Sequence, residues 1–118
     1  MSKSQRASVH PGCNQGAPPR GQPLTEAAAE EIVLTLKALA DPVRLRLFSA
    51  VASRSGGEAC VCDVSEGLAV SQPTISHHLK VLREAGLLTA QRRGSWVYYA
   101  VVPAALSALT DRLIGVQV

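Results

Sequence analysis

Two cysteines separated by one residue are the part of this sequence with the clearest chemical potential. Cys60 and Cys62 lie in the segment Glu58-Ala-Cys-Val-Cys-Asp63. Two thiolates are soft ligands and favour a thiophilic ion. The sequence has no second cysteine pair and no suitably spaced histidine to complete a structural zinc site. A pair of small buried hydrophobic residues is the other interpretation of this motif.

The spacing of the pair restricts the backbone that can hold one ion. Residues i and i+2 of an α-helix point roughly 200° apart, so both thiols reach one centre only from an extended or turn segment. Asp63, with Glu66 three residues later, resembles a capping box and predicts that a helix begins just after Cys62. The dipole of that helix would favour a thiolate at Cys62. We therefore expect a bound ligand to fix or distort the start of this helix.

The helix expected after the cysteine pair has the pattern of a DNA-reading helix. Ser71 and Pro73 are typical of a helix start, and Gly86 is typical of a helix stop. The side expected to face the core comprises Ile75, His78, Leu79 and Leu82. The opposite side is short, polar and partly basic, which fits a DNA major groove. A polar helix face that only meets water, in a small α/β domain, is the alternative interpretation.

A β-hairpin is predicted next, and a short helix is predicted before. Two β-prone runs, at residues 87–92 and 96–102, are joined by Arg92-Arg93-Gly94-Ser95. The short helix is expected at residues 64–68, with a tight connection at 69–70. Helix, turn, helix and a basic-tipped hairpin together predict a winged helix-turn-helix.

Three further helices complete the predicted fold, which is mainly α (α+β). Their expected ranges are about residues 26–40, 42–53 and 103–114. Thr25 and Asp41 are their expected N-caps, Pro42 and Pro103 suit a first helical turn, and the first helix has a core stripe at Ile32, Leu36 and Leu39. The last helix is strongly apolar for so small a domain. We therefore expect a homodimer formed through the first and last helices.

Composition and charge restrict the class of protein. The chain of 118 residues is enough for one domain, expected at residues 24–118. Residues 1–23 are rich in Pro, Gly, Ser and Gln and predict a disordered N-terminal arm, in which Cys13 lies. No run approaches the roughly 18 apolar residues of a membrane span, and no signal peptide is evident, which predicts a cytoplasmic protein without membrane contact. Three cysteines in such a chain favour metal binding or thiol chemistry.

The net charge of +3 comes from Lys3, Arg6 and Arg20 alone, so the predicted domain is neutral. DNA binding must then depend on local clusters of basic side chains and on two copies acting together. Base edges would be read by Gln72, Ser76 and His77. Phosphates would be bound by Ser71, Thr74, Lys80, Arg83, Arg92 and Arg93. His78, on the apolar flank of the helix, is expected to be structural.

Three motifs together resemble the ArsR/SmtB family of metal-responsive repressors, and most of all its arsenical-resistance operon repressors. They are Ala38-Leu-Ala-Asp-Pro-Val-Arg-Leu-Arg-Leu47, Glu58-Ala-Cys-Val-Cys-Asp63 and Ser71-Gln-Pro-Thr-Ile-Ser-His-His-Leu-Lys-Val-Leu82. The resemblance covers about residues 25–110. It implies a winged-helix homodimer that binds double-stranded operator DNA and releases it when As(III) or Sb(III) binds. It implies no catalytic cofactor and no enzymatic activity.

The resemblance also implies a ligand set for the inducer, with one departure. The family's arsenic motif maps onto Cys60 and Cys62, but its third cysteine falls at Ser65. As(III) usually takes three thiolates, so the third would come from Cys13, from a small molecule or from nothing. In some members of the family, cysteines of an N-terminal arm complete the site. The family's other metal site, on the last helix, is represented only by Asp111, which implies that it is missing here.

Other functions stay open at this point. The same fold could sense Cd(II) or Pb(II), or a persulfide or oxidant that joins Cys60 to Cys62. The chain could also be a small thiol enzyme, such as an arsenate or disulfide reductase. The sequence has no C-x-x-C motif and no phosphate-type anion loop, which argues against such an enzyme.

Overall fold

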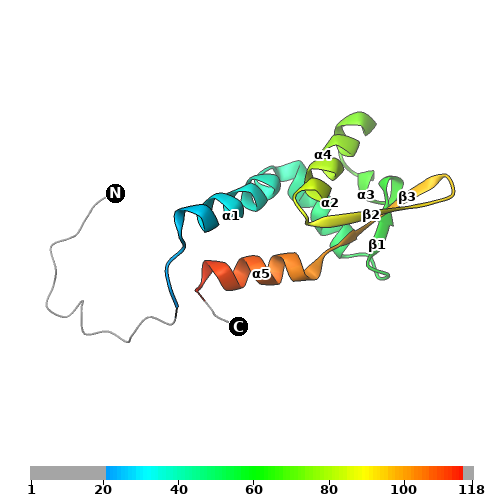
Figure 1. The fold of residues 1–118 in the computed structure, drawn as a ribbon. Coiled ribbons are helices and arrows are strands. Elements are labelled where there is room, and N and C mark those ends of the chain that lie inside the picture. Colours follow the sequence, from blue (N-terminus) through cyan, green and yellow to red (C-terminus); the bar gives the residue numbers. More distant parts are fainter. Residues whose placement is uncertain (1–20, 116–118) are drawn as a thin grey trace, which may run out of the picture.

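A computed structural model describes residues 21–115, which form five helices and a three-stranded antiparallel sheet (Figure 1). The elements are α1 Glu26–Leu39, α2 Pro42–Ala52, β1 Glu58–Cys60, α3 Val61–Ser65, α4 Gln72–Glu84, β2 Leu88–Arg93, β3 Trp96–Val101 and α5 Pro103–Leu113. This order confirms the predicted mainly α, winged helix-turn-helix fold. Cys13 and most of the predicted N-terminal arm lie outside the described residues, so the arm stays a prediction.

The caps expected from the sequence start three of the helices. The Asp41 carboxylate accepts hydrogen bonds from the backbone N–H groups of Val43 and Arg44, at 2.9 and 3.0 Å, and starts α2. The hydroxyls of Thr25 and Ser71 accept from backbone N–H groups in the first turns of α1 and α4. These contacts satisfy N–H groups that have no partner inside the helix, which is why the predicted starts hold.

The sheet has the order β1-β3-β2. The sequence analysis predicted β2 and β3 but not β1. The hairpin of β2 and β3 is the expected wing, with Gly94-Ser95 as its two-residue turn. Gly94 has a φ of +63°, a conformation that glycine adopts readily and that suits such a turn. Strand β1 pairs with β3, with Cys60 opposite Tyr98. Three residues are too few to show the period-two pattern of a strand, which is why the sequence analysis did not predict β1.

The hydrophobic core lies between α2, α4 and the inner face of the sheet. The side chains of Leu47, Val51, Ile75, Leu79, Leu82, Leu87 and Leu88 are its most deeply buried members. The expected core stripe of α4 is confirmed at Ile75, Leu79 and Leu82, whereas His78 is half-buried. Within the first helix, Ile32 is buried but Leu36 is 40% exposed, so that predicted stripe is only partly correct.

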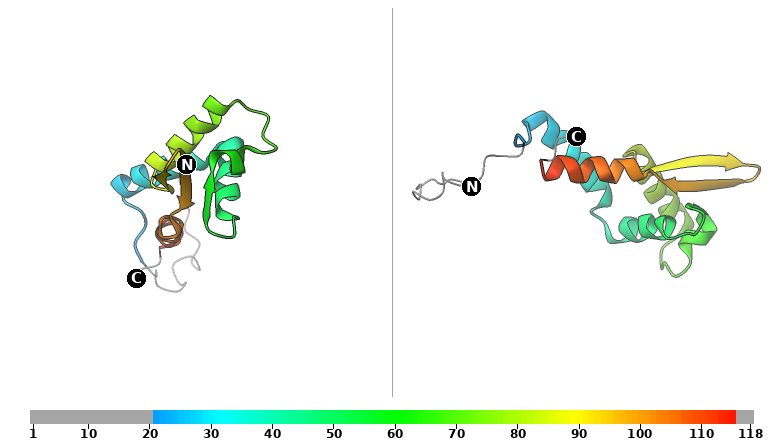
Figure 2. Two further views of the ribbon diagram at one scale, coloured as in Figure 1. Left: turned by 90° about the vertical axis from the view of Figure 1, so that its right-hand side faces the viewer. Right: turned by 90° about the horizontal axis from the view of Figure 1, so that it is seen from below.

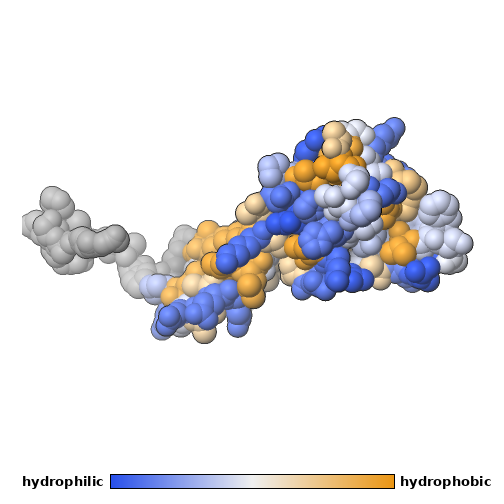
Figure 3. All heavy atoms as spheres, turned by 90° about the horizontal axis from the view of Figure 1, so that it is seen from above, coloured by the Kyte–Doolittle hydropathy of each residue, from blue (hydrophilic) through white to orange (hydrophobic). Residues whose placement is uncertain are grey.

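Helices α1 and α5 lie side by side and extend away from the rest of the fold (Figures 1 and 2). An ion pair between Arg112 of α5 and Glu31 of α1, at 3.4 Å, links them. No residue of α5 is buried, although Ala105 and Leu106 pack against the core. Figure 3 shows hydrophobic residues along this end of the molecule. In the described part of the chain, no helix is both long and apolar enough to cross a membrane.

Candidate thiol site and DNA interface

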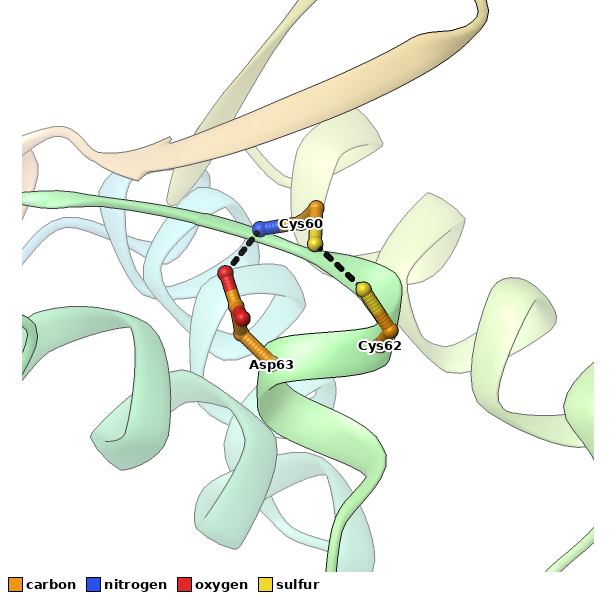
Figure 4. Close-up of side chains that lie close together, drawn as sticks. All are labelled: Cys60, Cys62 and Asp63. Atoms are coloured by element: carbon orange, nitrogen blue, oxygen red, sulfur yellow. Dashed lines mark hydrogen bonds between the residues drawn. The ribbon is translucent and has the colours of Figure 1, made fainter.

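The two cysteines meet where β1 passes into α3 (Figure 4). Cys60 is the last residue of β1, with φ −89° and ψ 171°, and Cys62 lies in the first turn of α3. Their Sγ atoms are 2.7 Å apart. Cys60 is buried and Cys62 is exposed, so a ligand can approach from the Cys62 side. The change from extended to helical backbone brings the two thiols together, as the i, i+2 spacing requires.

The start of α3 differs from the prediction. The helix begins at Val61 and ends at Ser65, whereas residues 64–68 were expected. Asp63 is not the N-cap but the third helical residue, and its carboxylate accepts a hydrogen bond from the backbone N–H of Cys60 at 3.1 Å. Cys60 therefore takes the N-cap position. The capping pair is shifted by three residues because the Asp63 side chain reaches back to the strand rather than forward along the helix.

The predicted electrostatic effect at Cys62 is also wrong. The pKa of the Cys62 thiol is raised, first by the contact with the Cys60 thiol, then by burial, with the charges of Cys60 and Asp63 acting in the same direction. A second sulfur and a nearby carboxylate outweigh the dipole of a five-residue helix. The raised pKa favours the protonated Cys62 thiol in the free protein, so binding of a metal ion at this sulfur must release a proton.

Asp63 completes a group of three potential ligands with Cys60 and Cys62, whose ligand atoms all lie within 4.8 Å of one another. Among residues 21–115 this is the one such group found. The Asp63 carboxylate is already engaged by the Cys60 N–H and by Arg54, at 3.3 Å. The backbone hydrogen bond from Cys60 is the main reason that its pKa is lowered. Because carboxylate is a hard ligand, a soft ion would use the two sulfurs and leave Asp63 to hold the turn.

Ser65 occupies the position at which the resemblance places a third cysteine. Its hydroxyl donates to the backbone carbonyl of Cys62 at 3.5 Å, one turn earlier in α3. A hydroxyl is a poor substitute for a thiolate with a soft ion. Cys13, the other predicted ligand, lies outside the described residues.

The polar face of α4 is open to solvent. Its exposed residues are Ser71, Gln72, Thr74, Ser76, His77, Lys80 and Arg83. The structure thus brings together all the residues predicted on this helix to contact DNA. Ser71 and Thr74 share a hydrogen bond between their hydroxyls at 2.9 Å, so part of their capacity is used within the helix cap.

The two arginines of the wing have different surroundings. The Arg93 guanidinium forms two hydrogen bonds to the Glu58 carboxylate, at 2.9 and 2.6 Å. It also donates to Gln91 at 2.8 Å and lies over the Tyr98 ring, 4.8 Å from its centroid. Arg92 is exposed on the other face of the hairpin. Sequence analysis missed Glu58, because its partner is 35 residues away and no local signal connects them.

Arg44 connects the start of α2 with two other helices. Its Nε donates to the carbonyl of Ala38 at 2.6 Å, and its Nη1 lies 3.2 Å from Nδ1 of His78. Arginine can only donate, so Nδ1 of His78 is the acceptor and its ring proton is on Nε2. This contact supports the structural role predicted for His78.

The sequence matches the family model described as bacterial regulatory protein, arsR family, over residues 41–90. An uncharacterised HTH-type transcriptional regulator of Methanocaldococcus jannaschii is 42% identical over 77 residues, which cover 65% of this chain and 80% of that protein. The chain belongs to the arsR family. Membership confirms the resemblance drawn from the three motifs, and it places the chain among DNA-binding transcriptional regulators, not enzymes.

Other relatives carry more specific names. The arsenic resistance transcriptional regulator ArsR1 of Pseudomonas putida is 47% identical over 70 residues, which cover 59% of this chain and 53% of that protein. The chain thus matches about half the length of that regulator. Among solved structures, the AntR antimony-specific transcriptional repressor aligns with a TM-score of 0.62, 30% identity and 89% coverage of both chains.

Proposed function

We propose that the protein is a transcriptional repressor of an arsenical-resistance operon, released from its operator when As(III) or Sb(III) binds Cys60 and Cys62. The observation that carries this proposal is the thiol pair, 2.7 Å apart, at the first residues of the helix-turn-helix α3–α4. Relatives named for arsenic resistance and for antimony support the choice of ion. Such a repressor works in the cytoplasm, beside the chromosome.

Release would follow from the position of the site. Cys60 caps α3 and Cys62 lies in its first turn, so an ion held by both sulfurs acts on the backbone that starts the helix-turn-helix. Val64 of α3 is buried in the core cluster that also holds Ile75 of α4. A shift of α3 therefore reaches the recognition helix through packed side chains. An inducer weakens operator binding only by the difference between its affinities for the free and the DNA-bound protein.

The DNA-contacting surface is proposed to consist of the exposed face of α4 and the wing. Gln72, Ser76 and His77 would read base edges in the major groove, because these side chains offer donors and acceptors at its floor. Ser71, Thr74, Lys80, Arg83 and Arg92 would contact phosphates.

The proposed active form is a homodimer joined through α1 and α5. Support comes from large apolar side chains that one chain leaves exposed on these helices and directly beside them: Leu24, Val33, Leu34, Leu36, Leu113 and Ile114. A second copy could cover them by a two-fold arrangement, which would also place two recognition helices on one face of a palindromic operator.

One observation favours a second candidate function. Two sulfurs 2.7 Å apart can also be oxidised by hydrogen peroxide, which would join Cys60 to Cys62 in a disulfide and be reduced to two molecules of water. The same backbone would then be constrained by a covalent bond and not by a metalloid. In this case the protein would be a repressor that senses oxidants.

A gel-shift titration distinguishes these functions. Duplex DNA from upstream of the protein's own gene is bound by the reduced protein and titrated with As(III), Sb(III), Cd(II), Zn(II) and hydrogen peroxide. We expect release by As(III) and Sb(III) at lower concentrations than by the divalent ions. Release by peroxide alone would establish the oxidant sensor, and release by Zn(II) alone would exclude both thiol mechanisms.

Variants of the cysteines test the ligand set. Replacement of Cys60 or Cys62 by Ser should leave DNA binding intact and abolish release by As(III). The role of Cys13 is decided by counting free thiols in the As(III) complex. No free thiol per protomer supports Cys13 as the third ligand in place of Ser65, and one free thiol excludes it. Heterodimers of one Cys13→Ser subunit and one Cys60→Ser subunit would show whether the site is formed between subunits. A site within one subunit would lose As(III) binding with all three thiols in both halves, whereas a site between subunits would keep it in one half.

The two classes of DNA contact are tested by salt and by operator sequence. Lys80→Ala should weaken binding to all duplexes equally and reduce the salt slope by about 0.9, the effect of one phosphate contact. Gln72→Ala should keep the salt slope and lose discrimination at particular base pairs, by about 1–3 kcal/mol. Identical behaviour of the two variants would show that α4 does not lie in the major groove.

A further inference from the structure

Cys60 of β1 and Arg93 of the wing lie on the same face of the three-stranded sheet. Residues directly opposite each other in an antiparallel sheet point to the same face. Tyr98 of β3 is opposite Cys60 of β1 on one side and opposite Gln91 of β2 on the other. Glu58 and Arg93 each lie two residues from one of these partners, so they share that face. Arg92 alternates to the opposite face.

The contacts of Arg93 cross the whole sheet. Its side chain extends from β2. The guanidinium lies over the Tyr98 ring of β3 and forms two hydrogen bonds with the Glu58 carboxylate of β1. A planar fork that is both stacked and bidentate holds one geometry, which a lysine ammonium cannot reproduce. The wing is thereby attached to the strand that ends in Cys60.

The pairing also changes what Arg93 offers to DNA. The Glu58 carboxylate, 2.6 Å from Nη2, cancels the charge of the guanidinium and occupies one N–H of each terminal nitrogen. A third N–H group, on Nη2, donates to the side-chain oxygen of Gln91. Arg92 is exposed near the tip of the same hairpin and takes no part in these contacts, so it is the better placed of the two for a phosphate.

We propose that Arg93 is a positioning residue that couples the Cys60–Cys62 site to the wing through Glu58, and that Arg92 is the wing's phosphate contact. The coupling part rests on the proposed function and adds a route to it. A ligand at Cys60 moves the end of β1, and the Glu58–Arg93 pair transmits this movement to the hairpin. The release of DNA then involves the wing as well as α3 and α4.

Operator binding of the full-length reduced protein tests the proposal, measured against salt with and without As(III). Parent protein should lose affinity with As(III) by roughly 5–150-fold, the usual range of allosteric coupling. Arg93→Ala should keep the salt slope, and Arg93→Lys and Glu58→Gln should reduce this factor severalfold. Arg92→Ala, the matched control, should lower the salt slope by about 0.9 and keep the As(III) factor. The double exchange Glu58→Arg with Arg93→Glu should recover part of the factor, because it restores the pair.

The opposite pattern overturns the proposal. If Arg93→Lys behaves like the parent and Arg93→Ala lowers the salt slope by about 0.9, then Arg93 is a phosphate contact. If Arg93→Ala does not fold, Glu58→Gln removes the same pair without a change in the wing. A parent that binds DNA but ignores As(III) would refute the proposed function and the coupling with it. The salt slopes of Arg92→Ala and Arg93→Ala would still decide which arginine contacts phosphate.

Discussion

The winged-helix body, from α2 to β3, and the α1–α5 pair differ in how far a single chain buries their apolar side chains. In the body, Leu47, Leu79, Leu82 and Leu87 are completely buried within one chain. On the pair, Leu113 remains 50% exposed and Leu34 66% exposed, and no residue of α5 is buried. Apolar side chains thus form a closed core in one region and leave an uncovered surface in the other.

This difference indicates which region depends on a second copy. Burial of a leucine side chain contributes about 1.5–3 kcal/mol, and the body gains this contribution without a partner. The pair gains it only if another chain covers it. The two regions meet at the α1–α2 joint, where Asp41 caps α2 and Arg44 binds the last carbonyls of α1. Substitutions in each region and at the joint test this difference.

The largest effect is expected from a cavity in the body. Leu79→Ala removes a side chain with no exposed surface from the centre of the cluster and should lower the free energy of unfolding by about 2–5 kcal/mol. Urea unfolding at a fixed protein concentration measures it. Leu45→Ala, at a position 51% exposed on α2, is the control and should change stability by less than about 0.5 kcal/mol. Equal losses in both variants would contradict the closed core of the body.

A charge on the pair should separate dimerisation from folding. Leu113→Glu places a carboxylate on the exposed apolar surface of α5 and should give folded monomers, with operator affinity reduced on the order of a hundredfold because two half-sites no longer act together. Light scattering after gel filtration gives the mass, and circular dichroism gives the helix content. Leu45→Glu matches it in exposure, 51% against 50%, but lies outside the pair and should stay dimeric. A monomeric variant with full operator affinity would exclude this interface.

A smaller effect is expected at the joint. Arg44→Ala removes the hydrogen bonds to Ala38 and Lys37 and the contact with His78, and should cost about 1–2 kcal/mol of stability. Arg44→Lys should recover little, because an ammonium cannot bind three acceptors in one plane. Arg46→Ala, an exposed neighbour on the same helix, is the control and should be nearly neutral. If Arg44→Ala were equally neutral, α1 would be held by its apolar contacts alone.

The smallest effect is a dependence on pH at the same joint. The backbone N–H of Arg44 is the main reason that the pKa of Asp41 is lowered. A carboxyl whose pKa is lower in the folded state stabilises the fold above its unfolded pKa, about 3.9, and this contribution is lost as the pH falls through the folded pKa. Asp41→Asn keeps a cap acceptor without the charge. Its urea midpoint should lie below that of the parent near neutral pH, and the difference should shrink below about pH 4.

Much of the proposed DNA interface could be predicted from the sequence because its signals are local. Ser71 satisfies an N–H three residues away, Gly86 takes a positive φ just after α4, and the 3.6-residue period assigns Leu79 to the core. Each signal acts within one or two turns of the chain. The requirement for non-helical backbone at Cys60 or Cys62 followed from helix geometry alone, and the structure meets it.

Tertiary structure decided what depends on partners far along the chain. Strand β1 exists because β3, about 40 residues later, offers it a hydrogen-bonding edge, and three residues have no strand pattern of their own. That pairing placed Glu58 against Arg93, so that Arg93, unlike the adjacent Arg92, forms an ion pair within the chain. It also fixed Cys60 in extended backbone, so α3 begins three residues earlier than its own sequence indicates. The Cys62 sulfur consequently lies 2.7 Å from the Cys60 sulfur, and this contact raises the pKa of the Cys62 thiol.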